Sequence, residues 1–395
     1  MKKFFLVVVR ALLLGVLAVS LFTGSVSNVV YAQTTTVASK ATTDVKYPEA
    51  FHKALLSLAD KRFDFEKWKA TAAAEKIAAN ARNDFLYPQE MDPAIFAYWD
   101  ALGIKREVHD ADNKDLKWTT YTPVRALAAN NTAVYPVVFN FGREGTGIAE
   151  LGAKEGFITV RPGNNAVPRE GKLPADGLTP GRQVVRILDL LKAQGYPIDR
   201  SRVYVTGHSI GGMASAWAGL EFPEVVTAIA MHSSLAAFNT NKIDVKGTRA
   251  PMVMPPDLYT KAMDYDIPMW LAVGEVDFDQ LPIRTEGAIN GLNLWLQVND
   301  CPTKLTLPDS LAAAAIGTDP AVKLIGVPGD KTWAQTIDGV VYRGVDYFRK
   351  DGVKMIEIIG VENQPHWVTA AYPELAWKFM SRFSKDANGK LIVAK

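Results

Sequence analysis

The sequence has little cysteine, little histidine and no excess of charge of either sign. It contains one Cys, five His, 44 basic and 42 acidic residues among 395. A single cysteine excludes an intrachain disulfide, and Cys301 lacks the neighbouring ligands of a zinc site, so we interpret it as structural. The balanced charge, without basic clusters, argues against a nucleic-acid partner.

Long hydrophobic runs are also missing, and the longest apolar stretch lies near the N-terminus at residues 11–22. It is too short to span a bilayer as a helix. Basic residues from Lys2 to Arg10 precede it and Val30-Tyr31-Ala32 follows, which is the pattern of a secretory signal peptide over residues 1–32. We therefore predict an exported protein, extracellular or periplasmic, without stable membrane insertion. Removal of the segment's three basic residues would change the net charge from +2 to −1.

The remaining chain divides by composition into three parts. Residues 33–46 are rich in Thr and Ala, as in a flexible linker. Residues 47–115 carry apolar residues at helical spacing, which predicts an N-terminal helical extension. From residue 116 to 395, short β-rich runs alternate with amphipathic segments, which predicts an α/β catalytic domain with a mostly parallel, doubly wound sheet and helices on both faces. The expected strands are 118–123, 135–141, 156–160, 202–206, 226–231, 269–273 and 354–359, and the expected helices are 182–194, 210–221 and 373–383.

A longer, mixed segment at about 279–351 interrupts the late part of this alternation. It predicts an insertion of one or two helices and a hairpin between core strands. Whether the insertion covers a site as a lid is left open by the sequence.

The motif that carries the chemistry is Gly207-His208-Ser209-Ile210-Gly211, between an expected strand and an Ala-rich expected helix. In that context G-x-S-x-G is a nucleophile elbow, in which a tight turn lifts the serine hydroxyl above the sheet. The two glycines remove side chains that would collide with the turn. We therefore predict that Ser209 is a nucleophile, and the alternative is a glycine-rich turn with an inert serine.

A nucleophilic serine needs a base and an orienting acid, and in this arrangement the order along the chain is Ser, acid, His. His366 is the only histidine well beyond Ser209 that also follows a late strand, so we predict it as the base. The strand ending at Gly274 is followed by Asp277, which we predict as the acid, with Asp279 and Glu275 as the alternatives.

The oxyanion of an acyl-transfer intermediate needs two backbone N–H donors. We predict Ile210, directly after the nucleophile, as one of them. The second is expected in the loop after the early strand, where Gly142 allows close approach and Arg143 supplies the N–H. This chemistry requires neither a metal nor an organic cofactor. His208, His232 and Trp367 are further candidates to line the cleft, together with Gly142.

Beyond the five-residue motif, the run from Ile198 to Met213 (IDRSRVYVTGHSIGGM) resembles the elbow of the α/β-hydrolase superfamily, and within it the secreted polyhydroxybutyrate depolymerases and feruloyl or acetylxylan esterases. The Gly274–Asp277 strand end and the Pro365-His366 loop also look like that group, so the resemblance covers about residues 118–386. It implies a serine carboxylic-ester hydrolase acting on small-molecule or polymeric esters. One departure is Phe141-Gly142, where the family usually carries His-Gly.

Two alternatives are compatible with the same residues. One is a serine peptidase of the prolyl-oligopeptidase type, but the segment between Tyr47 and Leu116 is too short for the propeller domain that those enzymes usually carry. The other is a non-catalytic binding protein with the same fold, and the presence of all three triad residue types in order argues against it.

Overall fold

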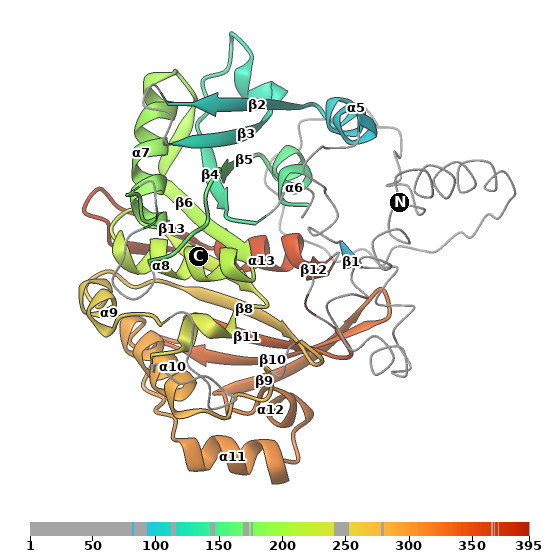
Figure 1. The fold of residues 1–395 in the computed structure, drawn as a ribbon, viewed down its shortest axis with the longest axis vertical. Helices are drawn as coiled ribbons and strands as arrows, with labels where there is room; N and C mark the ends of the chain where they lie inside the picture. Colours follow the sequence, from blue (N-terminus) through green and yellow to red (C-terminus); the bar gives the residue numbers. More distant parts are fainter. Residues whose placement is uncertain are drawn as a thin grey trace, which may run out of the picture.

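The computed structural model describes residues 81–82, 93–111, 116–142, 147–168, 174, 177–240, 253–277, 280–364, 366, 368–369 and 371–394 (Figure 1). The predicted signal peptide, the linker and most of the predicted helical extension lie outside these residues. Among the described residues, no helix combines the length and the apolar character needed to cross a membrane.

One ten-stranded sheet organises the described part of the chain. The strands, in spatial order, are β2 (Ile104–Asp110), β3 (Lys117–Pro123), β5 (Ile158–Pro162), β4 (Tyr135–Asn140), β6 (Ile198–His208), β7 (Ala228–His232), β8 (Met269–Gly274), β11 (Lys354–Val361), β10 (Val340–Phe348) and β9 (Lys331–Ile337). The six strands from β5 to β11 are parallel. The strands at both edges are antiparallel. Two short antiparallel pairs join β1 (Ala81–Arg82) to β12 (Val368–Thr369) and β13 (Phe383–Lys385) to β14 (Leu391–Val393).

Helices precede, connect and follow the strands of the sheet. They are α5 (Pro93–Ala101), α6 (Ile148–Glu155), α7 (Pro180–Ala193), α8 (Ile210–Glu221), α9 (Pro256–Ala262), α10 (Glu286–Val298), α11 (Leu307–Ile316), α12 (Pro320–Ile325) and α13 (Tyr372–Met380), with the 3-10 turns η1 (Val124–Leu127) and η2 (Leu235–Phe238). Capping explains several starts: Thr179 accepts a hydrogen bond from the Arg182 amide and Pro180 stands at the first position of α7.

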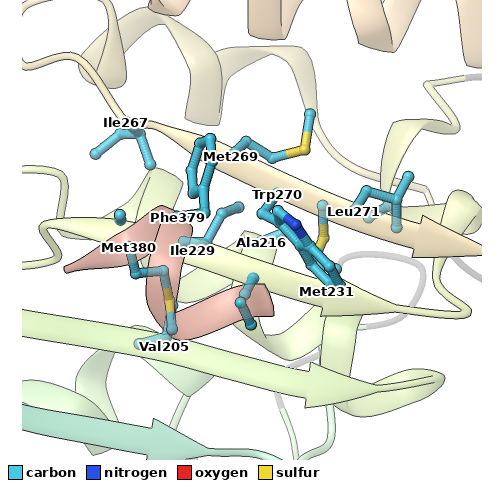
Figure 2. Close-up of a cluster of buried hydrophobic side chains, with 14 of the residues drawn as sticks. Val205, Ala216, Ile229, Met231, Ile267, Met269, Trp270, Leu271, Phe379 and Met380 are labelled. Atoms are coloured by element: carbon cyan, nitrogen blue, oxygen red, sulfur yellow. The ribbon is translucent and has the colours of Figure 1, made fainter. Parts of the chain in front are cut away.

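Strands β7 and β8 are buried along their whole length, and β6 is buried from Val203 onwards, because helices cover both faces of the sheet. On one face, Tyr204 of β6 packs edge-on against Trp377 of α13, with ring centroids 5.6 Å apart. On the opposite face, Ile229 of β7 lies against Gly219 of α8, where a Cβ would come within 2.9 Å of the Ile229 side chain. Figure 2 shows the core at this level, with strand residues packed among side chains of α8 and α13.

The predicted fold class is confirmed, and most predicted strands and helices occur within a few residues of their expected positions. The prediction of a helical extension over residues 47–115 is wrong for Ile104–Asp110, which form strand β2 of the main sheet. Its residues, Ile-Lys-Arg-Glu-Val-His-Asp, are mostly charged because an edge strand with an exposed side needs no apolar alternation.

The predicted insertion contains three helices, α10 to α12, where one or two were expected, followed by the expected hairpin of β9 and β10. The hairpin pairs with β11 through β10 and so extends the main sheet at its late edge (Figure 1).

Candidate active site

Ser209 occupies the turn between β6 and α8, with φ 58° and ψ −121°. This backbone conformation is rare for a residue with a side chain and indicates a turn that the surrounding structure enforces. A Cβ on Gly207 would fall on the backbone of Gly211, and a Cβ on Gly211 would fall on the carbonyl of Phe141. Neither position has room for a side chain, because another backbone segment passes close to it, as in a nucleophile elbow.

The neighbouring strand holds this turn in place. The Ser209 amide donates to the carbonyl of His232 at 2.9 Å. The Ser234 hydroxyl donates to the carbonyl of Ser209. Gly212 leaves the space for that hydroxyl, because a Cβ there would meet the Ser234 side chain at 2.5 Å.

His366 lies between Ser209 and Asp277 and is within hydrogen-bond distance of both. Its Nε2 is 2.8 Å from the Ser209 Oγ, and its Nδ1 is 2.7 Å from the Asp277 Oδ1. The three residues come from the ends of β6, β8 and β11, which are parallel, so their carboxyl ends meet at the same edge of the sheet. The structure thus brings together the three residues that sequence order predicted.

Asp277 is fully buried beneath the imidazole. Burial raises the pKa of this carboxyl, but the charge and hydrogen bond of His366, with a smaller contribution from the Ser233 hydroxyl, outweigh burial, and the net pKa is lowered. The carboxylate form is therefore favoured, which is the state that can stabilise an imidazolium next to it.

Gln280 and Ser233 are site residues that the sequence reasoning missed. The Gln280 Nε2 donates to the Asp277 Oδ1 at 2.7 Å, and its Oε1 accepts from the Leu235 amide at 2.8 Å. Gln280 follows Asp277 by three residues, which is the spacing of a β-turn that brings the two side chains together. This spacing is the sequence feature that could have identified Gln280. Ser233 gave no such signal, because its hydroxyl approaches Asp277 only when β7 and β8 lie side by side.

Of the predicted cleft residues, the histidines lie deeper than expected. His232 is fully buried, so its prediction as a cleft-lining residue is wrong. The reason is that the β7 end is covered by Tyr372 of α13, whose ring meets His232 edge-on at 5.2 Å. His208 is 5% exposed, and its ring lies 4.6 Å from that of His366, so it contacts the base from the side of the sheet.

The loop after β4 is held by polar side chains around Gly142. The Gly142 amide donates to the Asn140 Oδ1 at 2.9 Å, so this N–H is already engaged. Arg161 donates to the Gly142 carbonyl at 3.2 Å, and Asn165 donates to the Phe141 carbonyl at 3.3 Å. These three holding residues were also missed, and only their position at strand ends could have suggested them.

Of the two predicted oxyanion donors, Ile210 lies within the described residues. Ile210 is the first residue of α8, where backbone N–H groups have no partner within the helix. Its amide is therefore available next to the Ser209 hydroxyl. Arg143, the predicted second donor, lies outside the described residues, as does Trp367.

Glu275, one of the two alternatives to Asp277, has a different partner from the imidazole. Glu275 accepts a hydrogen bond from the Asn363 amide at 2.8 Å, which ties the loop after β8 to the loop that carries His366. Asp279 lies outside the described residues. In the described part of the chain, no group of three or more His, Cys, Asp or Glu is arranged to hold a metal ion.

The strand order, the turn at Ser209 and the Ser-Asp-His order along the chain together define the architecture. The chain has the α/β-hydrolase fold. A scan against protein-family models and a search of curated proteins each find no match.

Solved structures similar to the α/β-hydrolase chain include esterases and peptidases. An acetyl xylan esterase from Aspergillus awamori is 17% identical, with 70% of this chain and 98% of that one covered and a TM-score of 0.40. An S-formylglutathione hydrolase from Agrobacterium tumefaciens is 17% identical, over 50% and 84%, with a TM-score of 0.34. A candidate dipeptidyl aminopeptidase IV from Bacteroides ovatus is 12% identical, over 70% and 35%, with a TM-score of 0.40. The chain thus spans about a third of the length of that protein.

Proposed function

We propose that the protein is a serine carboxylic-ester hydrolase that works through an acyl-enzyme. The observation that carries this proposal is the continuous pair of hydrogen bonds from Ser209 through His366 to Asp277, with donor–acceptor distances of 2.8 and 2.7 Å. That geometry is what a histidine needs to take the serine proton while its other nitrogen is held by a carboxylate.

In the proposed reaction, His366 Nε2 accepts the proton of the Ser209 hydroxyl as the oxygen attacks the ester carbonyl. The resulting oxyanion accepts a hydrogen bond from the Ile210 N–H, with Arg143 proposed as the second donor. His366 then gives the proton to the leaving alcohol, and the C–O bond of the ester breaks. Water, deprotonated by His366, attacks the acyl-serine, and the acid is released with Ser209 restored.

In the proposed reaction, Asp277 orients the imidazole of His366 and stabilises its positive charge. Its carboxylate accepts a hydrogen bond from His366 Nδ1–H, which leaves Nε2 free to act as the base. Since the pKa of Asp277 is lowered, the carboxylate stays ionised while the imidazole becomes charged.

For the substrate we propose aromatic, short-chain or polymer-linked esters, supported by the resemblance of the run from Ile198 to Met213 to feruloyl, acetylxylan and polyester esterases. We also infer export, supported by the pattern of residues 1–32. N-terminal sequencing of the protein recovered outside the cytoplasm tests this inference, with Gln33 as the expected first residue.

The experiment that tests the activity is hydrolysis of p-nitrophenyl esters from acetate to octanoate, and of methyl ferulate. We compare the wild type, Ser209→Ala and the exposed control Ser381→Ala. Turnover by the wild type and by Ser381→Ala, but not by Ser209→Ala, is expected, and the chain-length and ferulate profile then defines the substrate class. A folded wild type that turns over no ester would contradict the proposal and favour a peptidase or a binding protein.

A further inference from the structure

A second concave site lies on the face of the sheet that carries α13. It is a cavity of about 510 Å³, within the range of small-molecule sites. It forms because the hairpin of β9 and β10 extends the sheet beyond the edge of α13, which leaves a corner between helix and hairpin. In Figure 1 this hairpin lies beyond β11, on the side away from β6.

The cavity is distinct from the triad. Glu357 of β11 and Trp270 of β8 line it and are register partners in the parallel pair. They stand four residues before Val361 and Gly274, the strand ends that lead to the triad. At about 3.3 Å per residue, this places the two lining residues roughly 13 Å back along the strands from the active-site edge.

Trp333 forms a fixed aromatic wall of the cavity. Its indole lies directly on Gly344, its partner on the neighbouring strand, where a Cβ would collide with the ring. The indole Nε1 donates to the Asp346 Oδ1 at 3.0 Å. A ring held at both points is a preorganised surface on which a flat apolar face can stack at low entropic cost.

Acidic and basic side chains pair with one another in the lining of the cavity. Glu357 is 8% exposed, and the Lys354 ammonium donates to its Oε1 at 2.9 Å. The same ammonium lies 3.4 Å from the Asp346 Oδ2. The Arg382 guanidinium stacks on Phe379 at 4.7 Å from the ring centroid. Burial raises the pKa of Glu357, the Asp346 carboxylate adds to that effect, and Lys354 and Arg382 offset it only in part.

These groups select for a ligand that is neutral and rich in hydroxyls. Asp346 and Glu357 line the interior together with Lys354 and Arg382, and the exposed Lys331 and Lys378 bring the lining to four cations and two carboxylates. A cation is therefore disfavoured, and an anion that entered the interior would meet the two carboxylates. A sugar unit has hydroxyls that donate and accept, and an apolar ring face that stacks on an indole.

We propose that this cavity, with Trp333 as its platform and Glu357 as a buried hydrogen-bond acceptor, binds a neutral sugar unit of an oligosaccharide or polysaccharide. The proposal does not depend on the esterase activity, because none of its residues belongs to the triad. Binding here would hold a carbohydrate chain on the protein at a point away from Ser209.

The test is calorimetric titration of the full-length protein with xylohexaose and with cellohexaose, and with hexagalacturonate as an acidic counterpart. We expect at least one neutral hexamer to bind at millimolar concentration or below. Trp333→Ala should weaken that binding about tenfold or more, while Trp333→Phe, which keeps a ring, should stay within about threefold of the wild type. Ser209→Ala should bind as the wild type does, which separates this site from the triad.

The thermal unfolding and p-nitrophenyl ester turnover of each variant serve as the control for folding. If Trp333→Ala does not fold, Gln335→Ala at the exposed rim replaces it, with an expected loss of about fivefold in affinity. No binding of either neutral hexamer, undiminished binding by the substituted proteins, or tighter cavity-dependent binding of hexagalacturonate would each overturn the proposal.

Discussion

The side-chain amide of Gln280 donates a hydrogen bond to the Asp277 Oδ1 at 2.7 Å, the same oxygen that lies 2.7 Å from His366 Nδ1. The other end of the amide accepts from the Leu235 backbone, so the side chain is fixed at both ends. Gln280 therefore sets the direction in which the carboxylate faces the imidazole, and it touches none of the reacting atoms.

Gln280→Ala should lower kcat for p-nitrophenyl acetate by about tenfold to a hundredfold with little change in KM, because substrate contacts are kept while the carboxylate loses its orientation. The pH–rate profile should shift as well, since the charge that stabilises the imidazolium is no longer held in place. Gln280→Glu, which cannot donate unless protonated, should fail to restore the rate.

The control is Gln297→Ala, at an exposed position of α10. A purely structural role for Gln280 would lower the melting temperature and leave the pH profile of the folded enzyme unchanged, and that result would contradict the positioning role.

Asp277→Asn tests the acid itself. The asparagine fits the same buried space, but its amide can offer a donor to His366 Nδ1, which favours the tautomer with the proton on Nε2. We expect kcat to fall by about 10⁴, as measured for the corresponding change in a serine protease. Asp257→Asn, at an exposed position of α9, should leave kcat unchanged. A loss below tenfold in Asp277→Asn would show that another carboxylate orients the base.

A site residue can be predicted from the sequence when its position is determined by residues close to it along the chain. Ser209 could be found because the turn imposes its requirements on adjacent residues, Gly207 and Gly211. Asp277 and His366 could be found because each follows a recognisable strand in a fixed chain order. For all three residues the evidence is a local motif or a fixed order along the chain, so motif spacing and periodicity are sufficient to predict them.

The residues that were missed depend on contacts between distant segments. Ser233 reaches Asp277 only across neighbouring strands, and the burial of His232 depends on α13, which comes about 140 residues later. The strand β2 was missed for a different reason: at a sheet edge its charged side chains remain in water, so no alternation marks it. Sequence patterns therefore predict the secondary structure and the local turns of a segment. They do not predict the contacts that the segment makes with distant parts of the folded chain.

Gly211→Ala should disrupt the elbow. The new methyl group would fall on the carbonyl of Phe141, so either the β4 loop or the turn at Ser209 must move. Both movements displace the proposed oxyanion donors from the serine, and a displacement of about 1 Å can cost about a hundredfold in rate. We expect the kcat of the folded variant to fall by at least that factor.

The matched control for this change is Gly291→Ala on α10, where a methyl group would fall on the carbonyl of Phe238. Both variants should unfold at lower temperature, but only Gly211→Ala should lose turnover per folded molecule. Equal turnover in the two folded variants would mean that the contact between Gly211 and Phe141 does not shape the site.

Lys385 makes the stability of the fold depend on pH. It is 3% exposed, and its ammonium donates to the carbonyls of Gly389 at 2.9 Å and Tyr265 at 3.3 Å. Burial lowers the pKa of Lys385 from 10.5 to about 8, partly offset by Asp266 and Glu224. Between these two values the unfolded chain binds more protons than the folded chain, so the free energy of unfolding rises with pH in that interval.

The wild type should therefore gain about 1–2 kcal/mol of stability relative to Lys385→Met between pH ~7 and pH ~9.5. Urea denaturation at the two pH values measures the difference, and Lys323→Met, at an exposed position of α12, is the control. If the stabilities of the wild type and Lys385→Met change in parallel over this range, the ammonium is as well solvated in the folded state as in the unfolded chain. Its two carbonyl hydrogen bonds would then fully replace the water that burial removes.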